Sequence, residues 1–152
     1  MFLWSIGCID PSSQEIKMDD KKIACEITVQ QDGENRPIAV VTLVNTSDES
    51  IHIESRHVFF DSIIKGNNFR ISLDGDKVPY IGRMVKRRPS GPNDYISIPA
   101  GERIAFQANL PQAYKLEGRS GQLQVQYSCI NTNKTSKGLT KIQSQIFETE
   151  LK

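Results

Sequence analysis

The amino-acid sequence predicts an all-β fold, an antiparallel sandwich of about 7–9 short strands. Apolar and polar residues alternate in several short segments, which is the pattern of strands with one buried and one exposed face. Turn-forming residues separate these segments at intervals of roughly 8–12 residues. No segment repeats apolar residues at helical spacing over about ten residues, so we expect helices to be short or absent.

The first half of the chain contains five of the expected strands. In residues 23–30 every second residue, starting from Ile23, is apolar, which indicates a strand with one wet face. Residues 38–44 are apolar and β-branched almost without interruption, as in a central strand. Shorter strands are expected at residues 51–53, 69–73 and 78–81, with a hairpin turn at residues 74–76.

The second half of the chain continues the same pattern. Strands are expected at residues 95–98, 104–110, 123–129 and 142–151. Residues 111–118 contain proline and glycine and have room for one helical turn. Short strands at this spacing are typical of an immunoglobulin-like β-sandwich.

Length and composition indicate one globular domain. The chain has 152 residues, of which 38% are hydrophobic and 24% charged, the balance of a soluble globular protein. We expect residues 1–22, which are largely polar after residue 8, to be a tether or a signal remnant and residues 23–152 to form the sandwich. The net charge of +1 argues against a general nucleic-acid binder. No apolar run is long enough to cross a membrane.

Cys8 is a candidate for lipidation. It follows an apolar segment and a small residue, which is similar to the end of a bacterial lipoprotein signal. A basic n-region is missing, and the apolar stretch is short for an h-region. One interpretation therefore places the native start upstream of Met1 and the protein in the periplasm or cell envelope. The alternative is an ordinary cytoplasmic N-terminus.

Cys25 and Cys129 are candidates for a disulfide. Both lie in strand-like segments near the two ends of the expected sandwich. In an oxidising compartment a bridge between them is plausible, and it would close a long loop. The alternative is a pair of reduced, buried thiols that pack as small hydrophobic groups.

The sequence offers no recognised catalytic or metal-binding constellation. Its two histidines, His52 and His57, lie outside any HExxH arrangement, and a spacing of five places them on opposite faces of a continuing strand. The sequence contains no Gly-x-Ser-x-Gly motif and no Gly-rich phosphate loop between a strand and a helix. We therefore expect a non-catalytic protein with no metal site and no cofactor.

The segment 83–89 concentrates positive charge in a nearly neutral chain. Four basic residues fall within six positions, and two prolines follow that would stiffen a loop. Such a loop is either an ordinary solvated loop or a docking loop for an acidic protein surface, with neighbouring apolar side chains as anchors. The candidate partner-binding residues are Tyr80, Arg83, Met84, Val85, Lys86, Arg87, Arg88 and Tyr95.

Four short motifs occur in a distinctive order. Val-Pro-Tyr-Ile-Gly at residues 78–82 leads into Val-Lys-Arg at 85–87, Asp-Tyr at 94–95 and Ala-Gly-Glu at 100–102. This order resembles the N-terminal domain of aspzincin metallopeptidases, the family of deuterolysins and peptidyl-Lys metalloendopeptidases. The resemblance extends over roughly residues 23–151.

The resemblance implies a propeptide-like β-sandwich that restrains a protease. The family's catalytic domain carries HExxH, which this sequence lacks, so no zinc or catalytic residue can be assigned here. The leading hypothesis is therefore a stand-alone inhibitor or immunity-type partner of an aspzincin-like metallopeptidase, with Lys86 or a neighbouring arginine as a substrate mimic. The alternative is an envelope-anchored binding or adhesion module without a protease target. An enzyme of unrecognised type is the third hypothesis.

Overall fold

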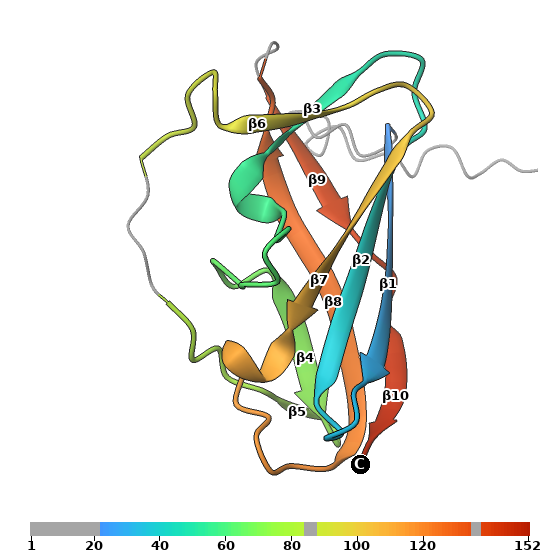
Figure 1. Cartoon of the computed structure of the whole chain (residues 1–152), viewed down its shortest axis with the longest axis vertical. Helices are drawn as coiled ribbons and strands as arrows, with labels where there is room; N and C mark the ends of the chain where they lie inside the picture. Colours follow the sequence, from blue (N-terminus) through green and yellow to red (C-terminus); the bar gives the residue numbers. More distant parts are fainter. Residues whose placement is uncertain (1–21, 84–87, 135–137) are drawn as a thin grey trace, which may run out of the picture.

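The computed structural model describes residues 22–83, 88–134 and 138–152. These residues form antiparallel sheets that pack as a β-sandwich, which confirms the predicted fold class (Figure 1). The strands are β1 (Ile23–Gln31), β2 (Pro37–Asn45), β3 (Ile51–Glu54), β4 (Phe69–Leu73), β5 (Asp76–Lys77), β6 (Tyr95–Ile98), β7 (Arg103–Asn109), β8 (Gly121–Thr132), β9 (Leu139–Gln143) and β10 (Phe147–Leu151). The described residues also form two short 3-10 helices, η3 (Ser55–His57) and η4 (Leu110–Gln112).

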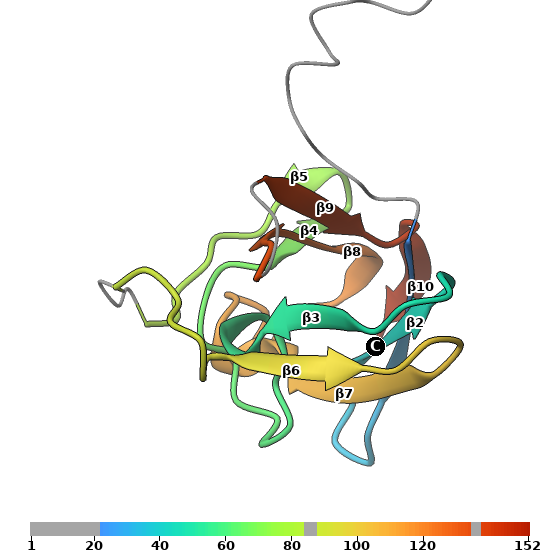
Figure 2. The ribbon, with the colours of Figure 1, turned by 90° about the horizontal axis from the view of Figure 1, so that it is seen from above.

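Two main sheets form the layers of the sandwich. One has the strand order β1-β2-β7, and the other has the order β10-β8-β4-β5, with β9 also paired to β8. A small third sheet, β3-β6, lies across one end of the molecule (Figures 1 and 2). The long strand β8 pairs with β4, β9 and β10 and so holds the second sheet together.

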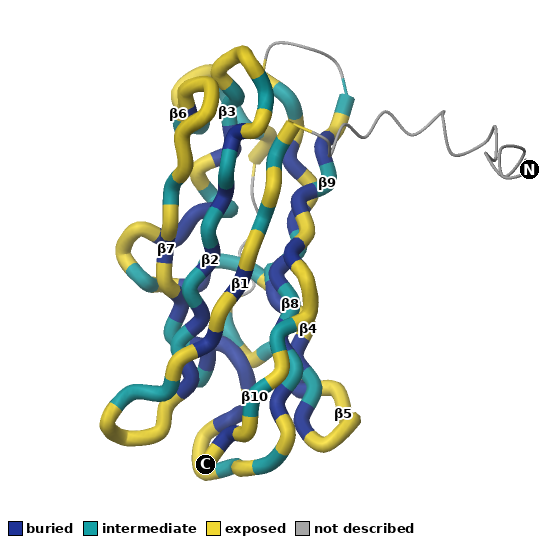
Figure 3. The backbone as a smooth tube through the Cα atoms, turned by 90° about the vertical axis from the view of Figure 1, so that its right-hand side faces the viewer, coloured by how far each residue is buried: buried dark blue, intermediate teal, exposed yellow. Residues whose placement is uncertain are grey.

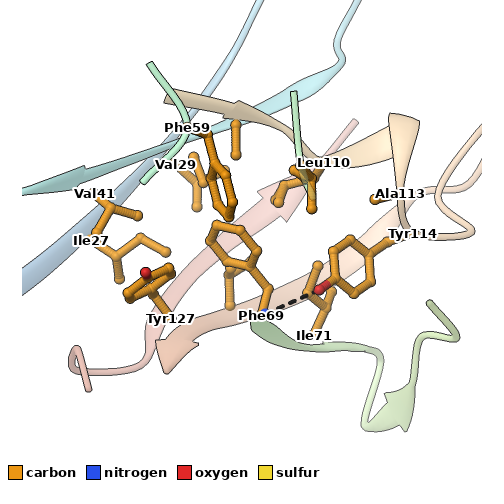
Figure 4. Packing of buried hydrophobic residues seen from close by; sticks show 14 of the residues in the cluster. Ile27, Val29, Val41, Phe59, Phe69, Ile71, Leu110, Ala113, Tyr114 and Tyr127 are labelled. Atoms are coloured by element: carbon orange, nitrogen blue, oxygen red, sulfur yellow. Dashed lines mark hydrogen bonds between the residues drawn. The ribbon is translucent and has the colours of Figure 1, made fainter. Parts of the chain in front are cut away.

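The core fills the space between the two layers. Alternate residues of β1, β2, β7 and β8 point inward and are buried, as Figure 3 shows along the chain. Aromatic rings dominate the centre, where Phe59 meets Phe106 edge-on with 5.4 Å between ring centroids. The buried hydroxyl of Tyr114 accepts a hydrogen bond from the Phe69 amide at 3.0 Å and donates to Asn67 at 2.8 Å (Figure 4). A buried tyrosine is tolerated here because its polar atom has partners.

The observed strands differ from the expected ones in two places. The segment expected as one final strand is interrupted at residues 144–146, so it forms β9 and β10. Ser144 causes the break, because its hydroxyl accepts from the Tyr127 amide and donates to a carbonyl of its own segment. The strand expected at residues 78–81 is also absent, since the hairpin after β4 ends at Lys77 and only an isolated bridge follows at Tyr80. With the two-residue strand β5 included, the described residues form ten strands, where about 7–9 were expected.

Glutamine side chains join the two sheets along the seam beside β1. The Gln145 amide nitrogen donates to the Ile27 carbonyl at 2.9 Å, and its oxygen accepts from the Ile27 amide at 3.3 Å. Gln31 repeats the arrangement, donating to the Glu150 carbonyl at 2.7 Å and accepting from the Lys152 amide at 3.0 Å. The Gln145 side-chain amide thus makes the hydrogen bonds that a neighbouring strand would make, and it covers part of the β1 edge. An uncovered strand edge can pair with strands of other protein molecules.

Replacing Gln145 with alanine should open this seam locally. Two backbone groups of Ile27 lose their partner, so we expect the free energy of unfolding to fall by about 1 kcal/mol. Urea denaturation monitored by circular dichroism measures the change. Gln143→Ala is the matched control, because Gln143 is exposed on the neighbouring strand. Equal stability of the two variants would contradict the role given to Gln145.

Candidate protein-binding loop and its anchor

The basic segment lies in the long connection between β5 and β6. Its described parts, residues 78–83 and 88–94, lie along one side of the sandwich (Figure 1). Met84, Val85, Lys86 and Arg87 lie outside the described residues, as do Cys8 and the rest of residues 1–21. Arg83 and Arg88 border the tip on either side, and both are exposed. The described part of the site consists of two limbs, residues 78–83 and residues 88–94.

The first limb is fastened to the segment after η4. Tyr80 forms a β-bridge with Tyr114, and their rings meet edge-on at 5.4 Å between centroids. The Ile81 amide donates to the Ala113 carbonyl at 2.7 Å. The Tyr80 hydroxyl donates to the Arg83 carbonyl at 2.6 Å, which holds the backbone immediately before the tip. Tyr80 is therefore a fixed support of the loop as well as a partly exposed surface residue.

The second limb is organised by Asp94. Its carboxylate accepts from the Arg88 guanidinium at 2.8 Å and from the Gly91 amide at 2.7 Å. The amide hydrogen bond from Gly91 and the pairing with Arg88 lower the pKa of Asp94 below its usual value. The Asp94 carbonyl in turn accepts from the Ser55 amide at 2.8 Å, which ties the limb to the end of β3. This limb returns to the sandwich along a defined path.

The buried carboxylate of Glu54 is the main anchor of the second limb. Its side chain is 0% exposed, yet it lies between donors from several elements. One oxygen accepts from the Thr132 amide of β8 at 2.7 Å and lies 3.3 Å from the His57 ring. The other oxygen pairs with the Arg56 guanidinium at 2.7 Å and accepts from the Ser90 hydroxyl of the limb. A buried charge is tolerated when it is paired and hydrogen-bonded in this way.

Glu54 also completes an unfinished edge of the sheet. β4 pairs with β8 only as far as Tyr127, so the end of β8 lacks a neighbouring strand on that side. There the Glu54 carboxylate accepts a hydrogen bond from the Thr132 amide, and the Tyr95 hydroxyl donates to the Thr132 carbonyl at 2.9 Å. Asn131 accepts from the Glu54 amide at 2.7 Å. The same carboxylate therefore holds both the sheet end and the loop.

Burial and pairing have opposite effects on the pKa of the Glu54 carboxyl group. Burial by itself raises the pKa of Glu54, but hydrogen bonds from Ser90 and Thr132 and the nearby His57 and Arg56 outweigh it, so the pKa is lowered. Burial lowers the pKa of His57, and the adjacent Glu54 only partly offsets that effect. The carboxylate is thus ionised and the imidazole is neutral at neutral pH.

The two strand cysteines are free thiols in the structure. Cys129 is buried and Cys25 is half-buried, and burial is the largest cause that raises the pKa of each to about 12. Each is therefore protonated and a poor nucleophile at neutral pH. Their pairing as a disulfide stays a prediction for an oxidising compartment.

The structure adds residues to the site that sequence reasoning missed. Tyr80 and Tyr95, which were expected as apolar anchors for a partner, each make a hydrogen bond within the fold. The expected opposite placement of the histidines assumed a continuing strand, but β3 ends at Glu54 and His57 belongs to η3. No sequence pattern predicts a site role for Glu54 or Ser90, and Asp94 enters the sequence analysis only as part of the Asp-Tyr motif at residues 94–95. A glutamate directly after the apolar residue of a strand is ordinary in sequence, and only its buried position reveals its role.

The described residues contain no group of three or more histidine, cysteine or acidic side chains that could hold a metal ion. Within the same part of the chain, no helix is long and apolar enough to cross a membrane. No family model matches this sequence, and a comparison with curated proteins found no match.

Glu54→Ala should destabilise the protein strongly. It leaves the Thr132 amide without a carboxylate and removes the counter-charge of Arg56, so we expect a loss of about 3 kcal/mol in the free energy of unfolding. Urea denaturation measures this loss. Glu102→Ala, which removes an exposed carboxylate, is the control and should change stability by less than about 0.5 kcal/mol. A loss at Glu54 as small as that at Glu102 would show that the anchor is not needed.

The lowered pKa of His57 predicts a loss of stability in mild acid. Below the ordinary histidine pKa of 6.5, the unfolded chain binds a proton at His57 that the folded protein does not, so stability decreases as pH falls. We expect the thermal midpoint to drop between about pH 7.5 and about pH 5.5, and the drop to be smaller in His57→Gln. His52→Gln is the control at the other histidine. Identical pH profiles for wild type and His57→Gln would contradict this assignment.

Proposed function

We propose that this chain is a non-catalytic protein-binding domain, an inhibitor or immunity-type partner of an aspzincin-like metallopeptidase. The observation that carries the proposal is that both limbs of the basic loop are fastened to the sandwich. Tyr80 and Ile81 hold one limb, and Glu54 and Asp94 hold the other through Ser90 and Arg88. A loop whose ends are fixed loses less conformational entropy on binding than a free one.

The charge of the loop supports an acidic binding surface on the partner. Four basic residues lie within residues 83–88 of a chain whose net charge is only +1: Arg83 and Arg88 end the two limbs, and Lys86 and Arg87 lie between them. Arg88 keeps 74% of its side chain exposed although it pairs with Asp94. Charge of this kind steers association and fixes orientation more than it adds affinity.

The choice of a metallopeptidase as partner rests on the resemblance to the propeptide domain of that family. The loop would enter the catalytic cleft and block it sterically. Lys86 or an adjacent arginine would occupy the acidic pocket that peptidyl-Lys members of the family use for their substrate. Lipidation at Cys8 would add a membrane anchor and place the protein at the cell envelope.

Capture from the native cell lysate and secreted fraction, with partners identified by mass spectrometry, is the first experiment. We expect recovery of an HExxH-bearing peptidase whose activity disappears when this protein is added. Recovery of envelope components alone would instead favour the binding or adhesion module. Recovery of no partner at concentrations well above those of tight complexes would remove the support for the inhibitor proposal.

Reversing the charge of the loop tip tests the mechanism. The double variant Lys86→Glu, Arg87→Glu should weaken inhibition of the captured peptidase by at least about a hundredfold, because it faces an acidic surface with negative charge. Lys141→Glu with Lys152→Glu makes the same change in net charge, on β9 and after β10, and should leave inhibition unchanged. Equal inhibition by both double variants would overturn the loop mechanism while leaving partner capture intact.

A further inference from the structure

The outer face of the sheet β1-β2-β7 is unusually apolar along its central strand. Every second residue of β2 points outward and is only half-buried. These four residues form a stripe along β2, and three of them are aliphatic: Ile38, Val40, Thr42 and Val44. Figure 3 shows β1 and β2 at the surface of the molecule. An antiparallel sheet with one wet face normally places polar residues there.

The flanking strands contrast with β2. The outward residues of β1 and β7 are mostly exposed, and two of those opposite the stripe are short, Ala24 beside Val44 and Ala105 beside Thr42. The face therefore has an apolar centre, with alanines beside it at two positions and longer polar side chains at most of the others. A strand that is apolar on both sides is typical of one covered on both sides. Here the covering layer on the outer side is absent from the described residues.

The charges on this face are complementary to each other across the central strand. Glu26 on β1 lies beside Thr42, and Arg103 on β7 lies beside Val44, so the two charges flank the stripe two residues apart. A two-fold axis parallel to β2 places β1 of one copy over β7 of the other. Glu26 then lies over Ala105 of the second copy, two residues or about 7 Å along the strand from Arg103 of that copy. With the sheets about 10 Å apart, the two long side chains can still meet, and the symmetry makes this contact twice.

We propose that this face is a self-association surface that binds a second copy of the same chain. Aligned sheets pack face to face at about 10 Å, and β-branched side chains fill such an interface well. The charge pattern selects this occupant, since the face is complementary to itself and nearly neutral. The basic loop lies on another side of the sandwich, away from β1 and β2 (Figure 2), so a dimer leaves both loops accessible.

The size of the face sets the strength of the dimer. Three strands about 4.8 Å apart and seven residues long cover roughly 350 Å² per copy, less than the roughly 800 Å² per partner of a stable complex. The dimer is therefore expected to be weak and reversible, so it forms only at high protein concentration.

Sedimentation velocity of the full chain from about 1 to about 300 µM tests the proposal, and a concentration-dependent monomer–dimer equilibrium is expected. Val40→Lys should weaken the dimer at least about thirtyfold, because it places a charge at the centre of the interface. Ile130→Lys is the matched control, an exposed β-branched residue on β8, and should leave the equilibrium unchanged. A wild-type protein that is monomeric throughout would overturn the proposal, as would a dimer indifferent to Val40→Lys.

A charge exchange tests the two-fold geometry. Glu26→Arg alone and Arg103→Glu alone should each weaken the dimer about fivefold, because each creates like-charge pairs across the axis. The double variant should restore it. Failure of the double variant to recover would exclude the proposed pairing. If Val40→Lys abolished peptidase binding while the wild type stayed monomeric, the face would belong to the partner, and the self-association proposal would be wrong.

Discussion

The buried, ionised carboxylate of Glu54 is the interaction on which the loop end of the molecule depends. A charge with no exposed surface is stable only when donors surround it, and here they come from the backbone of β8, the helix η3 and the returning limb of the loop. Each of those elements is held in place by the same side chain. Removing the carboxylate therefore disturbs the sheet end and the loop together, which links stability to the geometry of the proposed binding site.

The Glu54 arrangement is one case of a more general device in this sandwich. The strand β8 is longer than any strand that pairs with it, so its neighbours leave backbone groups uncovered. Polar side chains take their place at the end of β8, where Glu54 accepts from the Thr132 amide and Tyr95 donates to its carbonyl. The same device occurs along the seam beside β1, where Gln145 pairs with the backbone of Ile27 and Gln31 pairs with the backbone of the C-terminal residues. These contacts satisfy groups that would be costly to bury alone, and they limit pairing with other chains.

The two proposed surfaces use different physics. The basic loop combines long-range charge with fixed limbs, which suits rapid and oriented association with an acidic partner. The outer face of β1-β2-β7 is nearly neutral, and its binding would come mainly from apolar area, with the Glu26 and Arg103 pair setting orientation. A dimer formed through this face would present two loops and so raise the apparent affinity for a partner that carries more than one site.

The sequence alone determined the sandwich, because a period of two fixes which side of each strand faces the core, and that information is local. It also located the positive charge of residues 83–88, because a cluster of basic residues close together in the chain is visible without a structure. It missed the split of the last strand at Ser144 and the anchor at Glu54, because each depends on a partner far along the chain, Tyr127 for one and Ser90 and Thr132 for the other. A glutamate at the end of a strand looks solvated in sequence. Only the packing of β3 against the end of β8 removes it from water and brings its donors together.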